Sequence, residues 1–150
     1  MILIISNLFI NRFLCRVMKN DIRDKQDIIQ IVNTFYEKVK QDALIGHFFT
    51  EVIQVDWDKH LPKMYNFWDN VVFYTNNYTG NPMQVHKNIH ALHSFTAADF
   101  KQWYNLFATT VDELYEGDNA ALIKQRALSV ATIMQIKIAA VQDKSSLNII

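Results

Sequence analysis

Apolar residues recur at intervals of three and four along most of the chain, which is the repeat of an amphipathic α-helix. The repeat is clearest in residues 21–41, 57–74 and 97–116, and it continues from residue 118 onward. Within 57–74, His60 falls on the same face as Met64 and Phe67, which lie about one and two turns further along. The alternation typical of a half-buried strand is not evident. The pattern therefore predicts an all-α fold.

Polar and turn-forming residues mark where the helices should begin and end. Residues 75–82, TNNYTGNP, are dense in turn formers. Thr96 followed by Asp99 resembles a capping box, and Gly117 is placed to end the helix 97–116 with a left-handed cap. Residues 42–54, DALIGHFFTEVIQ, are expected to be short and loop-like.

The composition fits one globular domain and shows no excess of basic residues of the kind that binds nucleic acid or an anionic membrane. The chain has 150 residues, of which half are hydrophobic and a fifth are charged. Lys+Arg and Asp+Glu are equal at 15 each, so no basic excess would attract nucleic acid or an anionic membrane. The single cysteine, Cys15, excludes an internal disulfide and suits a reducing cytoplasm.

The first seventeen residues, MILIISNLFINRFLCRV, differ from the rest of the chain because they are strongly apolar. Arg12 and Arg16 follow the apolar run, whereas a secretory signal carries its positive charge in front. We expect residues 1–17 to be an N-terminal extension outside the fold, with translation starting at Met18 and a single domain over 18–150. The competing interpretation is an amphipathic helix that lies on a membrane surface.

Three of the five histidines lie in the segment NPMQVHKNIHALH, at His86, His90 and His93. The spacing of His86 and His90 matches the zinc-binding pair of an HExxH helix. Lys87 occupies the position of the catalytic glutamate there, so a hydrolase would lack its general base. A metal hydrolase and a non-catalytic helical interaction module both remain as alternatives at this point.

The apolar helix faces carry three residues whose side chains also have a polar group, namely Tyr36, His60 and Trp103. Buried Tyr and Trp usually need a hydrogen-bond partner, and an apolar pocket with a few convergent donors is the common form of a cofactor site. An imidazole facing such a pocket is suited to be the axial ligand of a haem iron. Ordinary core packing explains the same pattern, so the spacing alone leaves both interpretations open.

Several longer motifs favour the cofactor interpretation. In chain order they are FYEKV (35–39), the FF of GHFF (46–49), WDKHLPKMYNFW (57–68), GNPMQVH (80–86) and FKQWYNLF (100–107). Together they resemble the truncated haemoglobins of the third group, from about Lys19 to about Ile138. Residues 87–95 depart from the pattern, because this stretch is somewhat longer than in some members of the family.

The resemblance implies a globin-like two-over-two helical sandwich around haem b. It assigns the iron ligand to His86 and the distal, ligand-facing positions to Tyr36, His60 and Trp103. The further residues that it places around the cofactor are Phe49, Met64, Phe67, Met83 and His90. Whether residues 87–95 stay helical long enough for His90 to reach the haem is left open.

The function implied by the resemblance is the binding of O2 or another diatomic ligand, with NO or peroxide chemistry as a further possibility. We expect a cytoplasmic monomer that works with a separate reductase and has no nucleic-acid or membrane partner. The sequence does not distinguish a carrier from a sensor, a peroxidase or an NO-consuming enzyme, because the chemistry belongs to the cofactor and its redox partner.

Overall fold

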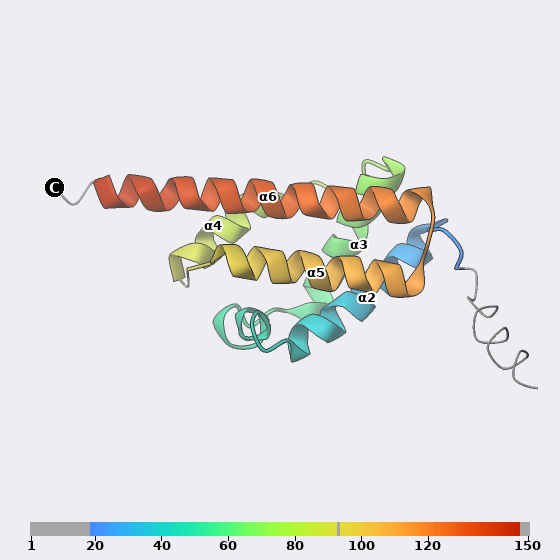
Figure 1. Cartoon of the computed structure of the whole chain (residues 1–150), viewed down its shortest axis with the longest axis horizontal. Helices are drawn as coiled ribbons and strands as arrows, with labels where there is room; N and C mark the ends of the chain where they lie inside the picture. Colours follow the sequence, from blue (N-terminus) through green and yellow to red (C-terminus); the bar gives the residue numbers. More distant parts are fainter. Residues whose placement is uncertain (1–18, 93, 148–150) are drawn as a thin grey trace, which may run out of the picture.

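The computed structural model describes residues 19–92 and 94–147 (Figure 1). The helices of this part are α2 (Lys25–Gln41), the π-helix η1 (Phe48–Val52), α3 (Trp57–Phe73), α4 (Pro82–Leu92), α5 (Ala97–Leu114) and α6 (Asp118–Leu147). No strand occurs in these ranges, so the all-α prediction is confirmed. The extension 1–17, with Cys15, and His93 lie outside the described residues, and the predictions for them stay predictions.

Two pairs of helices form the body of the molecule. α2 packs on α3, α5 packs on α6, and the contacts of α2 with α5 and of α3 with α6 join the pairs. Figure 1 shows α5 and α6 running antiparallel side by side, with the short α4 beside α6. Among the helices of the described ranges, none combines the length and the apolar character that a bilayer span requires.

Aromatic side chains fill the core where the two pairs meet. Phe35 of α2 and Phe107 of α5 are buried, and their rings meet edge to face with centroids 5.3 Å apart. Trp68 of α3 stacks on Phe107 at 4.5 Å. Burying each of these side chains contributes about 2 kcal/mol, and offset or edge-to-face aromatic pairs contribute about 1 kcal/mol more.

The first helix of this part begins later than its hydrophobic pattern predicts. α2 starts at Lys25 rather than at residue 21. Asp24 is its N-cap, since the Asp24 carboxylate accepts hydrogen bonds from the backbone N–H groups of Gln26 and Asp27. Residues 21–23, which precede this cap, lie outside the helix.

Asp21 caps a helix that is remote in sequence. Its carboxylate accepts the backbone N–H groups of Asn119 and Ala120, at 2.9 Å each, in the first turn of α6. Gly117 makes room for this carboxylate, because a Cβ on Gly117 would lie 2.4 Å from the Asp21 carboxyl carbon. The prediction that Gly117 caps the preceding helix is wrong, since α5 already ends at Leu114 and Gly117 has φ +155°.

Two other local predictions have different outcomes. The capping box of α5 is confirmed, because Thr96 and Asp99 each accept the other's backbone N–H. The segment 42–54 is not a loop throughout. Its residues 48–52 form η1, in which the N–H of Ile53 donates to the carbonyl oxygen of Phe48.

Replacing Asp21 by alanine should destabilise the fold in a pH-dependent manner. Burial alone raises the pKa of Asp21, but the backbone N–H groups of Asn119, Ala120, Ile22 and Asp118 together outweigh it and bring the pKa below the ordinary value of 3.8. The carboxylate therefore stabilises the fold fully above that value, and the stabilisation is lost as the pH falls through the lower, folded pKa. We expect Asp21→Ala to lower the free energy of unfolding at neutral pH by about 1–2 kcal/mol.

Urea unfolding of both proteins between neutral and acid pH measures this effect. The difference between them should shrink below pH 3.8. Asp58→Ala is the control, because Asp58 is exposed on α3 and makes none of these contacts. A difference that stays constant with pH would contradict the capping role of the Asp21 carboxylate.

Candidate functional site

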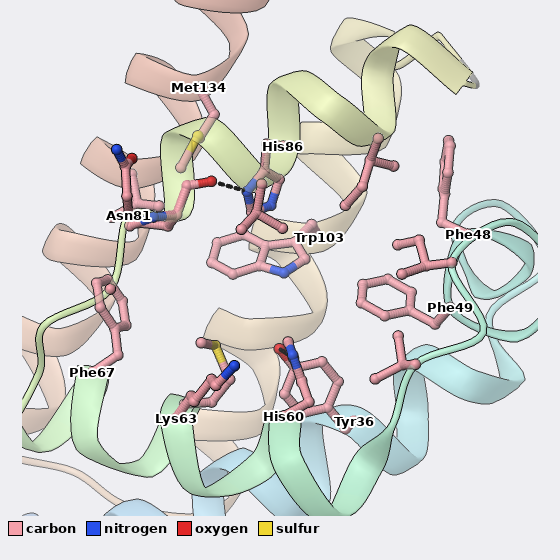
Figure 2. Close-up of a pocket in the computed structure, with 18 of the residues that line it drawn as sticks. Tyr36, Phe48, Phe49, His60, Lys63, Phe67, Asn81, His86, Trp103 and Met134 are labelled. Carbon is pink, nitrogen blue, oxygen red and sulfur yellow. Dashed lines mark hydrogen bonds between the residues drawn. The ribbon is translucent and has the colours of Figure 1, made fainter.

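The described helices surround a large, mainly apolar cavity of about 810 Å³. This volume lies in the upper part of the range for small-molecule and cofactor sites. Its wall includes residues of all five α-helices and of η1. Figure 2 shows His86 of α4 on one side of the cavity and the pair Tyr36 and His60 on the other. The structure therefore brings these three predicted residues to one site.

His86 presents a free ring nitrogen because of a hydrogen bond within its own helix. Its Nδ1 lies 2.7 Å from the carbonyl oxygen of Pro82, drawn as a dashed line in Figure 2. A carbonyl oxygen can only accept, so Nδ1 must carry the hydrogen and Nε2 keeps its lone pair. Burial lowers the pKa of His86, and the hydrogen bond to Pro82 offsets only part of this. A neutral imidazole oriented by its second nitrogen is the usual form of a histidine that binds metal.

Tyr36 and His60 form a neutral hydrogen-bonded pair across from His86. The Tyr36 hydroxyl oxygen and His60 Nε2 are 2.8 Å apart. Burial raises the pKa of Tyr36, whereas burial, together with Lys63 and His86, lowers the pKa of His60. When His60 Nε2 carries the hydrogen, it donates to the phenol oxygen, and the phenol O–H is left to donate into the cavity. The tautomer of His60 thus decides which group acts as the donor.

Trp103 supplies another donor to the cavity wall. Its ring is held from α2 by Phe35, edge to face at 5.7 Å, and from its own helix by Phe107, stacked at 5.7 Å. An indole N–H can only donate, and no acceptor for it is recorded among the described residues. Figure 2 shows the Trp103 ring at the cavity. The N–H is therefore available to a molecule bound there.

The remaining predicted residues divide into two groups. Phe49, Met64 and Phe67 line the cavity as expected, whereas Met83 and His90 do not. α4 stays helical past His90, but the buried His90 Nδ1 accepts the backbone N–H of Phe95 at 2.9 Å. His90 thus fixes the turn between α4 and α5 instead of facing the cavity.

The structure also adds wall residues that the sequence reasoning missed. Lys63 and Ile89 line the cavity, and each lies three residues after a predicted site residue on the same helix. The helical repeat alone was enough to find them. Met134 of α6 also lines the cavity. Its position depends on how α6 packs on the rest of the molecule, and no local motif signals it.

The metal-cluster alternative gains no support from the described residues. In these ranges no three His, Cys, Asp or Glu side chains gather as they would around a metal ion. The sequence shows no evident third ligand beside His86 and His90, and His93, which could serve as one, lies outside the described residues.

Comparisons with known proteins add an independent observation. No protein-family model matches the chain. In sequence it is 29% identical, over 121 residues, to the group 3 truncated haemoglobin ctb of Campylobacter jejuni, covering 79% of this chain and 93% of that protein. In structure it matches the crystal structure of a group III truncated haemoglobin from Campylobacter jejuni with a TM-score of 0.69 and 28% identity, over 81% of this chain and 95% of that one.

The chain has the fold of a group III truncated haemoglobin. The resemblance read from the motifs is thereby confirmed in both sequence and structure. In this truncated-globin fold, α4 carries His86 on one side of the cavity, and α2 and α3 carry Tyr36 and His60 on the other.

His90→Ala should destabilise the fold without changing the cavity wall. The variant leaves the backbone N–H of Phe95 without its acceptor and removes a ring stacked on Phe95 at 6.0 Å. We expect the free energy of unfolding to fall by about 1–3 kcal/mol, measured by chemical unfolding. Gln84→Ala, on the exposed side of α4, is the control. Equal stability of His90→Ala and the wild type would show that His90 does not fix the turn.

Proposed function

We propose that the cavity binds haem b with His86 as the axial ligand of the iron, and that a diatomic ligand such as O2 binds beside Tyr36, His60 and Trp103. The observation that carries the proposal is the free Nε2 of a neutral His86 facing the Tyr36–His60 pair across an apolar cavity of about 810 Å³. The similarity to truncated haemoglobins supports a globin-type role in binding haem and small ligands.

The chemistry of the wall fits a haem. Phe49, Met64 and Phe67 supply apolar surface for a flat, hydrophobic macrocycle. Lys63 is exposed and also lines the cavity, so its ammonium can pair with a haem carboxylate without being buried. Lys59, one turn earlier, already pairs with Asp56 at 2.7 Å. The single imidazole at His86 matches the one axial ligand that a globin provides.

Haem, when bound, would supply the iron to which a diatomic molecule can bind. The residues of the chain then determine how long that molecule stays. The phenol of Tyr36 and the indole N–H of Trp103 donate hydrogen bonds, which are strongest when the acceptor carries negative charge. His60 orients the phenol through its 2.8 Å contact and lines the cavity beside it. Several donors slow the release of a polarised ligand such as O2.

Slow release suits storage, sensing, or NO or peroxide chemistry better than oxygen delivery. We extend the proposal to a cytoplasmic monomer that depends on a separate reductase. The hydrolase alternative still lacks a general base, because Lys87 stands where the glutamate would be. A non-catalytic helical module explains neither the large cavity nor the polar groups that converge in it.

His86→Ala should abolish or severely weaken haem retention, because no second imidazole lines the cavity wall opposite Tyr36 within the described residues. The ratio of Soret absorbance to protein after purification measures retention. His90→Ala is the matched control and should keep the haem, since His90 lies outside the wall. Full occupancy with an unchanged spectrum in His86→Ala would remove His86 from its proposed role.

Tyr36→Phe should accelerate O2 dissociation by roughly tenfold to a hundredfold, the range expected for losing one hydrogen bond to a charged acceptor. Stopped-flow displacement of O2 by CO measures the rate. Trp103→Phe, measured in parallel, reports the contribution of the indole donor. An unaltered dissociation rate in Tyr36→Phe would mean that Trp103 or His60 holds the ligand instead.

A further inference from the structure

Trp57, the first residue of α3, packs against Tyr36 without lining the cavity. The two rings meet nearly edge to face, at a centroid distance of 5.3 Å and an angle of 66°. Tyr36 is 6% exposed, whereas Trp57 is only half-buried. The contact therefore joins a phenol in the cavity wall to an aromatic ring that reaches the surface.

Trp57 differs in its redox chemistry from the other rings recorded around Tyr36. In the part of the chain that the structure describes, those rings belong to Phe35, Phe49 and His60. Phenylalanine and neutral imidazole hold their electrons far more tightly than indole and phenol, which lose one electron at similar potentials. Among these recorded neighbours, Trp57 is therefore the ring that can exchange an electron with Tyr36.

The second indole at the cavity, Trp103, offers no comparable path to the surface. Trp103 stacks on Trp68 at a centroid distance of 6.4 Å, and Trp68 is 3% exposed. The other ring contacts recorded for Trp68 are with phenylalanines. An electron taken from Trp103 is thus replaced only from within the core, whereas one taken from Tyr36 can be replaced through Trp57.

We propose that Trp57 is the surface end of an electron relay that reduces Tyr36 when peroxide is consumed in the cavity, and that the electrons come from a small phenolic reductant. The proposal deepens the peroxide chemistry of the proposed function and rests on it. In the overall reaction, one hydrogen peroxide and two phenols give two water molecules and two phenoxyl radicals. The reductant then need not enter the cavity that haem would fill.

The hydrogen bond of Tyr36 gives its proton a place to go when the electron leaves. Burial raises the pKa of Tyr36, so the resting phenol is neutral. When this phenol donates to His60 Nε2 across 2.8 Å, the loss of an electron from Tyr36 sends the phenol hydrogen to that nitrogen.

Trp57 completes the cycle by replacing the lost electron. As Trp57 gives one electron to Tyr36, the proton returns from His60, and the indole N–H of Trp57 releases its own proton to solvent. The released proton balances the one that is taken up when peroxide forms water. A phenol at the surface then gives Trp57 one hydrogen atom and leaves as a phenoxyl radical.

Lys40 determines which of the two rings keeps the oxidised state. Its ammonium lies 4.4 Å from the centre of the Trp57 ring and also pairs with the Glu37 carboxylate at 2.9 Å. A cation over an indole face stabilises the neutral ring, so Lys40 disfavours positive charge on Trp57. The oxidised state therefore rests on Tyr36 inside the fold, and Trp57 is oxidised only in passing.

Oxidation from solvent tests the Tyr36–Trp57 contact on the as-purified protein. A light flash with tris(bipyridine)ruthenium and persulfate produces a one-electron oxidant, and rapid freezing followed by electron paramagnetic resonance records the radicals. The tyrosyl component that Tyr36→Phe removes is the Tyr36 radical. We expect Trp57→Phe to lower this component several-fold. Tyr65→Phe is the control on the same helix, because the Tyr65 hydroxyl bonds to Asn33 and not to Tyr36.

This measurement separates the relay from the proposed function. It requires neither peroxide nor haem, whereas a missing Soret band would count against the proposed function alone. A Tyr36 component in Trp57→Phe that equals the wild type would overturn the relay.

Peroxide-driven oxidation of a phenol linked to poly(ethylene glycol), which is too bulky to enter the cavity, tests the flow of electrons from the surface. The rate per haem should fall several-fold in Trp57→Phe and recover in Trp57→Tyr, because both variants keep a ring but only tyrosine is readily oxidised. Lys40→Met should raise the rate, since it keeps the apolar stem and removes the charge. A wild-type rate in Trp57→Phe, or a loss that Trp57→Tyr does not restore, would overturn the relay.

Discussion

The anchoring of Phe35 in the core determines where the polar group of α2 points. The Phe35 ring contacts Phe107 at 5.3 Å and Trp103 at 5.7 Å, both edge to face from α5. Adjacent residues of an α-helix point about 100° apart, so fixing Phe35 in the core turns Tyr36 toward the cavity. The same contacts hold Trp103 at the cavity wall. One aromatic cluster thus joins the helix pairs and positions two of the donors.

The second constraint is electrical neutrality inside the cavity. Burial raises the pKa of Tyr36 and lowers the pKa values of His60 and His86, so all three stay uncharged. The charged forms of these side chains would be costly in an apolar environment. A neutral ring can still donate one hydrogen bond through its hydrogen, or bind a metal or accept a hydrogen bond through its lone pair. The carbonyl of Pro82 selects the tautomer of His86. On the side of the cavity opposite His86, the tautomer of His60 decides which group of the Tyr36–His60 pair donates a hydrogen bond.

The sequence predicted best those features that depend on neighbours in the chain. The capping box at Thr96 and the helical face that carries His60 follow from short-range rules, and the structure confirms the capping box. The start of α2 and the role of Gly117 could not be predicted in this way. Both depend on Asp21 reaching the first turn of α6, a contact between residues almost a hundred positions apart.

In the site, too, motifs along the chain identified residues, whereas contacts between helices could not be predicted. Motif resemblance named His86, Tyr36, His60 and Trp103, but the 2.8 Å contact between Tyr36 and His60 is a property of the packing of α2 on α3. The spacing of His86 and His90 suggested equivalent positions. The turn after α4 makes them different, because Phe95 brings its backbone N–H to His90.

The absorption spectrum of the as-purified protein, recorded with and without CO, tests most directly whether the cavity holds a haem through His86. The protein, loaded with haem as proposed, gives a Soret band that shifts when CO is added to its reduced form. A colourless protein that gains no such band when haem is added would contradict the account, and bound zinc in its place would favour the metal hydrolase.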